Sequence, residues 1–428
     1  MDRTGASGAG GRFESYVAEL AGVIGHADRV GPLKDYCTGL LLPGERKSAE
    51  PMASRTAPAR ASAQHQKLLH FVGVSEWSDA RVLAKVRELV LPAIERHGPV
   101  EAWILDDTGF PKKGKHSVGV GRQYCGQRGN QDNCQVAVSL SLANRHASLP
   151  VDWRLYLPKD WADDAARRDK AGVPAEVVFQ TKLAIALDQI RRAHALGLPR
   201  GTVLMDAAYG CDAALRAGIV ELGLDYAAAI PRDTLAWPAG TGPGPGRRKA
   251  SRHDEGLLQV REIAKTLPAE AWHVVAWREG TGGPMSSRFA RLRVRVPPRV
   301  RQPGDHAGEW LLVEWPEGEA EPTKYWLSTL PETISFPALV DIAKLRWRIE
   351  RDYQELKQEV GLGHYEGRGW RGFHHHATLC IAACGFLIRE RGAFPPSGGP
   401  AAAFLAEPAL PDGYRPRGAP DASRATRP

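Results

Sequence analysis

The most informative stretch of this 428-residue chain is DIAKLRWRIERDYQELKQEV, residues 341–360. Its apolar side chains recur at steps of three, four, seven and four residues, and Asp352 or Tyr353 fills the one long gap. Such spacing is typical of a single buried stripe on an α-helix. The stripe comprises Ile342, Leu345, Ile349, Leu356 and Val360. The spacing therefore predicts a helix over 341–360 that packs on a core.

Three charged side chains are predicted to lie beside this stripe. Counted from Ile342, Arg346, Glu350 and Lys357 fall at about 40°, 80° and 60° around the helix. A carboxylate between two cations suits a phosphodiester, because the cations hold phosphates and the carboxylate reaches a metal ion. The alternative is an ordinary surface Arg–Glu pair worth about 0.2–0.5 kcal/mol. From the helix alone, this alternative is favoured.

Further acids stand where predicted strands end. WILDDTGFPKKGKH, residues 103–116, begins as a buried strand that ends at Asp106 and Asp107, and GTVLMDAAYG, residues 201–210, places Asp206 after another strand. A lone acid at such a place is usually an N-cap or turn residue. Together with Glu350, however, these acids would repel one another unless cations neutralised them. Hard oxygen ligands suit Mg²⁺ or Mn²⁺, and two such ions can promote attack at phosphorus.

A basic segment follows the first acids. Between Thr108 and Gln131 the chain has no Asp or Glu but has five bases, Lys112, Lys113, Lys115, Arg122 and Arg128. A carboxylate here would repel a phosphate backbone, whereas these cations attract it. We therefore expect Lys112 and Lys113 to contact DNA.

The order of the predicted elements indicates an α/β protein. Residues 1–98 are expected to form a helical N-terminal region with a polar loop at 44–62. Residues 99–233 follow the order β-β-β-α-β-α-β, which suits a mixed sheet with helices on both faces. A β-rich insertion is expected at 234–334, with a Gly/Pro-rich loop at 238–253. The second part of the core, 335–390, contains the Glu350 helix, and 391–428 is expected to be a disordered tail.

Composition favours a soluble protein with an anionic partner. The net charge is +8, and the pI of about 9.2 favours partners such as nucleic acid. Six scattered cysteines indicate free thiols in a reducing compartment, and no secretory or membrane-spanning segment is predicted. We therefore expect a cytoplasmic protein. His374–His376, followed by Cys380 and Cys384, lack a second ligand cluster at zinc-finger spacing, so the two cysteines are expected to lie in the core.

These motifs resemble the DDE transposases of bacterial insertion sequences. In the group whose ribonuclease-H-like core is interrupted by a β-rich insertion, the last catalytic helix has the signature Tyr-x2-Arg-x3-Glu-x6-Lys. AKLRWRIERDYQELK supplies Arg346, Glu350 and Lys357 at that spacing, while Ala343 replaces the Tyr. LDDTG and LMDAAYG resemble the two Asp motifs of the family. Because the first catalytic Asp of the family precedes a Thr, the resemblance assigns that role to Asp107 rather than Asp106. The resemblance covers roughly residues 100–390.

The resemblance implies an enzyme that binds double-stranded DNA. Asp107, Asp206 and Glu350 would hold two Mg²⁺ or Mn²⁺ ions for nicking at transposon ends and for attack of the 3′-hydroxyl on target DNA. The expected DNA contacts are Arg346, Lys357, Arg348, Lys112, Lys113 and Trp326, with Trp347 as a second candidate for stacking on a flipped base. The partners would be terminal inverted repeats and target DNA, held by a homodimer. The resemblance also implies a bacterial protein that is associated with the nucleoid. For each Trp, ordinary packing is the competing interpretation.

Three functions remain open at this stage. The first is transposition, with strand cleavage and strand transfer. The second is a DNA nuclease on the same core that performs no strand transfer. The third is a DNA-binding regulator without catalysis, which the presence of all three acids disfavours. The N-terminal helices either recognise the terminal repeat or simply pack on the core.

Overall fold

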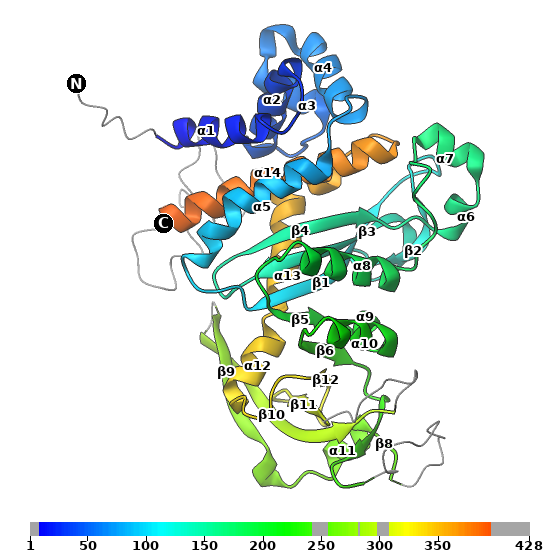
Figure 1. The fold of residues 1–428 in the computed structure, drawn as a ribbon, viewed down its shortest axis with the longest axis vertical. Helices are drawn as coiled ribbons and strands as arrows, with labels where there is room; N and C mark the ends of the chain where they lie inside the picture. The colour runs from blue at the N-terminus through cyan, green and yellow to red at the C-terminus, as the bar shows by residue number, and fades with distance from the viewer. Residues whose placement is uncertain (1–7, 242–255, 281–282, 298–307, 395–428) are drawn as a thin grey trace, which may run out of the picture.

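The structure, a computed structural model, describes residues 8–241, 256–280, 283–297 and 308–394. Figure 1 shows three stacked parts: a helical N-terminal end, a central sheet flanked by helices, and a β-rich end. The predicted Gly/Pro-rich loop and the predicted tail fall mostly outside the described residues. Helix α14 (Trp370–Ala393) extends three residues past the predicted boundary at 390.

The N-terminal part consists of helices that pack through their apolar faces. They are α1 (Ala9–Ala21), η1 (Ala27–Arg29), α2 (Val30–Leu41), α3 (Ala49–Thr56), η2 (Pro58–Arg60), α4 (Ala61–Gly73) and α5 (Asp79–Glu95). The prediction of a loop at 44–62 was wrong. Ala49, Met52 and Ala53 recur at helical spacing within this polar segment and are buried, and this small stripe is sufficient to dock α3 on its neighbours.

A mixed sheet forms the central part. Its strands are β1 (Ala102–Pro111), β2 (Gly121–Cys125), β3 (Asn130–Ala143), β4 (Ser148–Leu155), β5 (Thr202–Met205) and β6 (Tyr226–Ile230). β1 pairs antiparallel with β3 and parallel with β5, and β5 pairs parallel with β6. β4 pairs with β3. The sequence predicted every one of these strands except β2, whose short polar segment lacks an apolar run.

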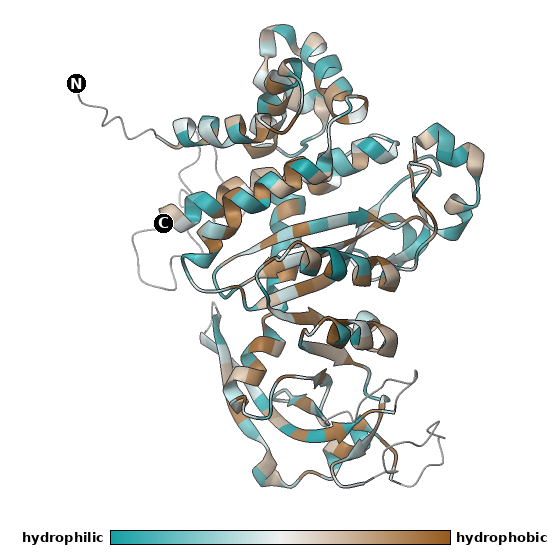
Figure 2. Ribbon diagram, in the orientation of Figure 1, coloured by the Kyte–Doolittle hydropathy of each residue, from teal (hydrophilic) through white to brown (hydrophobic). Residues whose placement is uncertain are grey.

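Helices flank this sheet, as the sequence predicted. They include α6 (Lys159–Ala162), α7 (Ala165–Ala171), α8 (Lys182–Ala195), α9 (Ala207–Gly210) and α10 (Ala213–Glu221). α8 packs on β3, whereas α14 packs on β4 and α5 (Figure 1). A mixed sheet with flanking helices is consistent with the expected ribonuclease-H-like fold. In Figure 2 the strands and α14 carry much of the hydrophobic colour, and no described helix is long and apolar enough to cross a membrane.

The β-rich part continues the central sheet. It contains β7 (Leu235–Pro238), β8 (Leu258–Gln259), α11 (Val260–Lys265), η3 (Ala269–Ala271), β9 (His273–Gly280), β10 (Gly283–Arg295), β11 (Glu309–Trp315) and β12 (Lys324–Ser328). β12 pairs antiparallel with β6, so the insertion extends the core sheet along one edge. β10 pairs antiparallel with β9 and β11, and along it Leu292 and Val294 alternate with Arg291, Arg293 and Arg295, the period of two that is typical of a half-buried antiparallel strand.

The helix predicted over 341–360 is divided. α12 (Phe336–Lys344) ends at a tight turn through Leu345 and Arg346, and α13 (Trp347–Gln354) begins there; η4 (Glu355–Glu359), a π-helical turn, and η5 (Leu362–His364) follow. Of the predicted stripe, Ile342 is half-buried and the other four side chains are buried. Tyr353 fills the gap, where its hydroxyl lies 2.7 Å from that of Ser139 on β3. The apolar pattern thus predicted the buried face but not the break.

Candidate active site

Arg346 stands at the centre of a group of carboxylates. Its Nη2 lies 2.7 Å from Oδ2 of Asp106 and 4.0 Å from Oδ2 of Asp206. Its Nη1 lies 3.7 Å from Oε1 of Glu350, one helical turn further along α13. The turn between α12 and α13 places this guanidinium beside the middle of β1 and the end of β5. The prediction that the first strand ends at Asp106 and Asp107 was wrong, because β1 continues to Pro111 through its pairing with β3. One cation therefore brings together acids that are separated by up to 244 positions in the sequence.

Asp106 is the most buried member of this group. Its side chain is 13% exposed, and its Oδ1 accepts a hydrogen bond from the N–H of Asp107. Burial raises its pKa from 3.8 to about 7, and the negative charges of Asp206 and Asp107 act in the same direction, while Arg346 opposes them. A buried carboxylate with too little positive charge nearby is suited to binding a further cation.

Asp107 points to the opposite face of the strand. Its Oδ2 accepts hydrogen bonds from Nζ of Lys182 on α8, at 2.9 Å, and from the hydroxyl of Tyr209, at 3.1 Å. The expected alternation of the two acids along the strand is therefore present. The face occupied by Asp106 is the one that carries Arg346, whereas Asp107 is neutralised by Lys182. The contacts of Arg346 favour Asp106, and the choice of Asp107 as the metal ligand stays a prediction.

Asp206 has two roles at the end of β5. Its Oδ1 accepts hydrogen bonds from the N–H groups of Ala208 and Tyr209, which is the N-cap arrangement expected for an acid before a helix. Its Oδ2 remains on the side of Arg346. The capping bonds fix the carboxylate, so that the second oxygen is held toward the cluster.

Glu350 is the most exposed of the acids. Its side chain is 73% exposed in the first turn of α13. Within the described residues, no group of three His, Cys, Asp or Glu side chains is close enough to hold a metal ion. The donors nevertheless suit a hard divalent cation, because they are carboxylate oxygens that already surround one cation, the Arg346 guanidinium. Asp106, Asp206 and Glu350 thus match such an ion in the chemistry of their donors, although they are not gathered closely enough here to hold one.

The predicted DNA-contacting lysines occupy different environments. Lys357 donates to the carbonyl oxygen of Gly109 at 2.8 Å and lies over the ring of Phe110, and burial lowers its pKa. Lys112 donates to the carbonyl of Tyr365 at 2.6 Å, and burial lowers its pKa as well. Lys113 is exposed. Lys357 and Lys112 thus tie β1 to the segment that follows α13, and Lys113 is accessible to a ligand.

Arg348 and Trp326, two further predicted DNA contacts, are buried in this structure. Arg348 is 6% exposed and donates to the backbone carbonyls of Arg145 and His146. Trp326 is 7% exposed within β12. Trp347 is half-buried, with the guanidinium of Arg278 4.2 Å from its ring centroid. These side chains pack within the fold, which was the competing interpretation for each Trp.

Sequence comparison agrees with this arrangement. The family model described as "DDE superfamily endonuclease" matches residues 19–284, which is more than half of the chain and includes Asp106, Asp107 and Asp206. The chain belongs to this family. The match confirms the resemblance to DDE enzymes. It ends before α13, so the role of Glu350 rests on the contacts of Arg346 and on the spacing of the helix motif.

A named relative points to mobile DNA. The chain is 31% identical over 166 residues to the "Probable transposase for insertion sequence element IS701" of Microchaete diplosiphon. The alignment covers 39% of this chain and 40% of that protein. The chain therefore spans less than half of the relative's length in this comparison.

Proposed function

We propose that this DDE-family protein is a transposase that cuts DNA at the ends of an insertion sequence and joins the 3′-hydroxyl to target DNA. The observation that best supports the proposal is the meeting of Asp106, Asp206 and Glu350 around Arg346. The named relative, a probable transposase, favours DNA as the substrate. The net charge of +8 suits binding of a phosphate backbone.

We assign the role of the first catalytic carboxylate to Asp106 rather than to Asp107. Asp106 lies on the side of Arg346, and burial raises its pKa, which supports a role in holding a further cation. Asp106, Asp206 and Glu350 would hold two divalent ions, Mg²⁺ or Mn²⁺. When bound, such ions would stabilise the attacking and leaving oxygens at phosphorus.

The chain's own cations would position the DNA. Arg346 neutralises the carboxylates in this structure, and the same guanidinium can bind a phosphate by a bidentate contact once the acids hold other cations. Lys357 keeps its ammonium beside the strand that carries Asp106, and exposed Lys113 adds attraction for the backbone. Asp107, with Lys182 and Tyr209, would stabilise the opposite face of β1 and hold Asp106 in place.

We also assign separate roles to separate segments of the chain. Residues 99–233 and 335–390 would form the catalytic core, interrupted by 234–334, and residues 1–98 would contribute to recognition of the terminal repeats. A homodimer would hold two ends together. A nuclease on the same core without strand transfer is the closest alternative, since it needs the same carboxylates.

Glu350 provides the sharpest test. Duplexes made from the DNA that flanks the gene, chosen for inverted repeats, are incubated with Mg²⁺ and either wild type or Glu350→Gln. The matched control is Glu332→Gln, which removes a carboxylate of nearly equal exposure, 75% against 73%. We expect Glu350→Gln alone to lose cleavage. Cleavage by Glu350→Gln at the rate of the control would refute the assignment, and cleavage without any joining to target DNA would favour the nuclease.

A further inference from the structure

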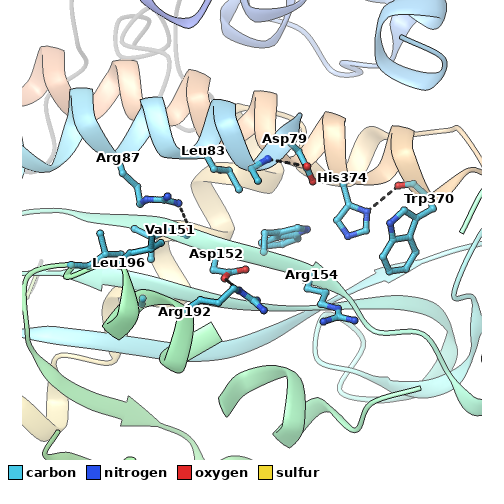
Figure 3. A pocket seen from close by; sticks show the side chains of 14 residues that line it. Asp79, Leu83, Arg87, Val151, Asp152, Arg154, Arg192, Leu196, Trp370 and His374 are labelled. Atoms are coloured by element: carbon cyan, nitrogen blue, oxygen red, sulfur yellow. Dashed lines mark hydrogen bonds and ion pairs between the residues drawn. The ribbon is translucent and has the colours of Figure 1, made fainter. Parts of the chain in front are cut away.

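A basic cleft lies at the edge strand β4, and it shares no residue with the carboxylate cluster. It has a volume of about 320 Å³ and lies between α5, β4, α8 and the start of α14. In Figure 3, Arg87 reaches into it from α5, while Arg154 and Arg192 line the opposite wall, and Trp370 and His374 close one end. Apolar side chains such as Leu83 and Leu196 complete its walls.

Two of the three arginines have no carboxylate partner. Arg192 pairs with Asp152 at 2.9 Å. Arg87 donates to the carbonyl of Val151 at 3.0 Å, and neither Arg87 nor Arg154 forms an ion pair within 4.0 Å to any acid in the described residues. Burial lowers the pKa of both, and the neighbouring charge of Arg192 lowers that of Arg154 further, while the charge of Asp152 raises the pKa of both only in part. Partly desolvated guanidinium groups of this kind are costly unless an anion neutralises them.

The other polar side chains of the cleft are compatible with a ligand that accepts hydrogen bonds. The indole N–H of Trp153, which lines the cleft, is buried without a hydrogen-bond partner. His374 is already satisfied, because it accepts from the N–H of Leu155 and donates to the carbonyl of Trp370. Two carboxylates also line the cleft: Asp152 pairs with Arg192, and Asp79 accepts a hydrogen bond from the N–H of Ala80. The charged groups of the cleft that have no ion-pair partner within the described residues thus include Arg87 and Arg154, which are hydrogen-bond donors suited to an anionic ligand.

We propose that this cleft binds a backbone phosphate of DNA at a position separate from the reacting strand. The guanidinium fork of Arg154 would contact the phosphate oxygens, and Arg87 would supply a second positive charge. The inference rests on the proposed function, since it takes DNA as the substrate. Because duplex DNA is longer than the carboxylate cluster, it can contact the edge of the sheet at the same time. A phosphate contact there would set the orientation of the duplex over the core.

Binding of a labelled duplex to the full-length protein, measured in EDTA over a range of salt concentrations, tests the proposal without cleavage. Arg154→Gln should bind about tenfold more weakly than wild type, and the slope of log K against log salt should fall by about 0.9. The control Arg191→Gln removes the same charge from an exposed position on α8, where Arg191 is 53% exposed beside Asp188. Arg154→Lys should restore most of the slope.

The outcomes are distinct from those of the cleavage test. Glu350→Gln should bind DNA normally in EDTA, so failure of the catalytic assignment would leave this measurement intact. Equal affinities and slopes for Arg154→Gln and Arg191→Gln, with both proteins folded by circular dichroism, would overturn the proposal. If inorganic phosphate raises the Tm of wild type but not of Arg154→Gln while the DNA affinities remain equal, the cleft binds free phosphate, and the assignment to DNA is wrong. Should Arg154→Gln not fold, Arg87→Gln takes its place against the same control.

Discussion

Replacing each of the adjacent acids on β1 by asparagine should have opposite consequences. Asp106→Asn removes a proposed metal ligand, so DNA cleavage should fall by about 10²–10⁴-fold, the loss expected when several kcal/mol of transition-state stabilisation disappear. Asp107→Asn removes only the partner of Lys182 and Tyr209 on the other face. Its cleavage rate should stay within about tenfold of wild type.

The stability of the metal-free protein supplies a second, independent readout. The pKa of Asp106 is raised from 3.8 to about 7, and at 1.36 kcal/mol per unit its ionisation costs the folded state roughly 4 kcal/mol. The unfolded chain loses this proton first, so stability falls as pH rises from about 4 to about 7, and the full cost is present above pH 7. Asp106→Asn abolishes this cost but also removes the partner of Arg346, so in EDTA at pH 8 we expect a net gain of about 1–4 kcal/mol.

Asp107→Asn, in contrast, should slightly destabilise the protein in urea unfolding. Its ion pair with Lys182 is partly exposed, 23% and 27% for the two side chains, so its loss should cost about 1 kcal/mol or less. Cleavage on the flanking duplexes and unfolding by circular dichroism are measured for both variants. The reasoning is refuted if Asp107→Asn is the inactive variant and Asp106→Asn cuts normally, or if Asp106→Asn is markedly destabilised at pH 8.

Three other variants test separate features of the fold and the site. Lys357→Met keeps the apolar contact with Phe110 but removes the ammonium, so DNA affinity in a salt titration should fall by about tenfold, and unchanged affinity would contradict a phosphate contact. Loss of the hydrogen bond to the carbonyl of Gly109 should cost about 0.5–1.5 kcal/mol in urea unfolding. Arg348→Met leaves two carbonyls without donors and should cost about 1–3 kcal/mol in urea unfolding without weakening DNA binding by the folded protein. Burial lowers the pKa of His376 from 6.5 to about 4, so the unfolded state binds the proton first and this side chain should contribute a loss of about 3 kcal/mol as pH falls from 6.5 to 4. Asp106 acts in the opposite direction over the same range, so the contribution of His376 is measured as the difference in stability between wild type and His376→Gln. A difference that does not change with pH would show that His376 does not titrate in this way.

Local patterns in the sequence determined most of the elements. Periodicity of 3.6 identified the buried stripe that includes Ile349 and Leu356, and apolar runs identified β1, β3, β4, β5 and β6, because these signals arise from neighbouring residues on one face. Spacing also placed Arg346 and Glu350 side by side, since residues four apart on a helix are neighbours. The same logic missed α3, whose apolar stripe is only one turn long, and the break at Leu345 and Arg346, where both residues keep helical dihedral angles.

Only the tertiary structure distinguished the two acids of β1. Alternation along a strand states that Asp106 and Asp107 face opposite sides, but not which side carries α13 and Arg346. That choice depends on how helices from distant parts of the chain pack on the sheet. The burial of Arg348 likewise follows from the distant carbonyls of Arg145 and His146, which no local pattern encodes. The sequence by itself thus defined the chemical set of acids and bases, and long-range packing selected the members that share one site.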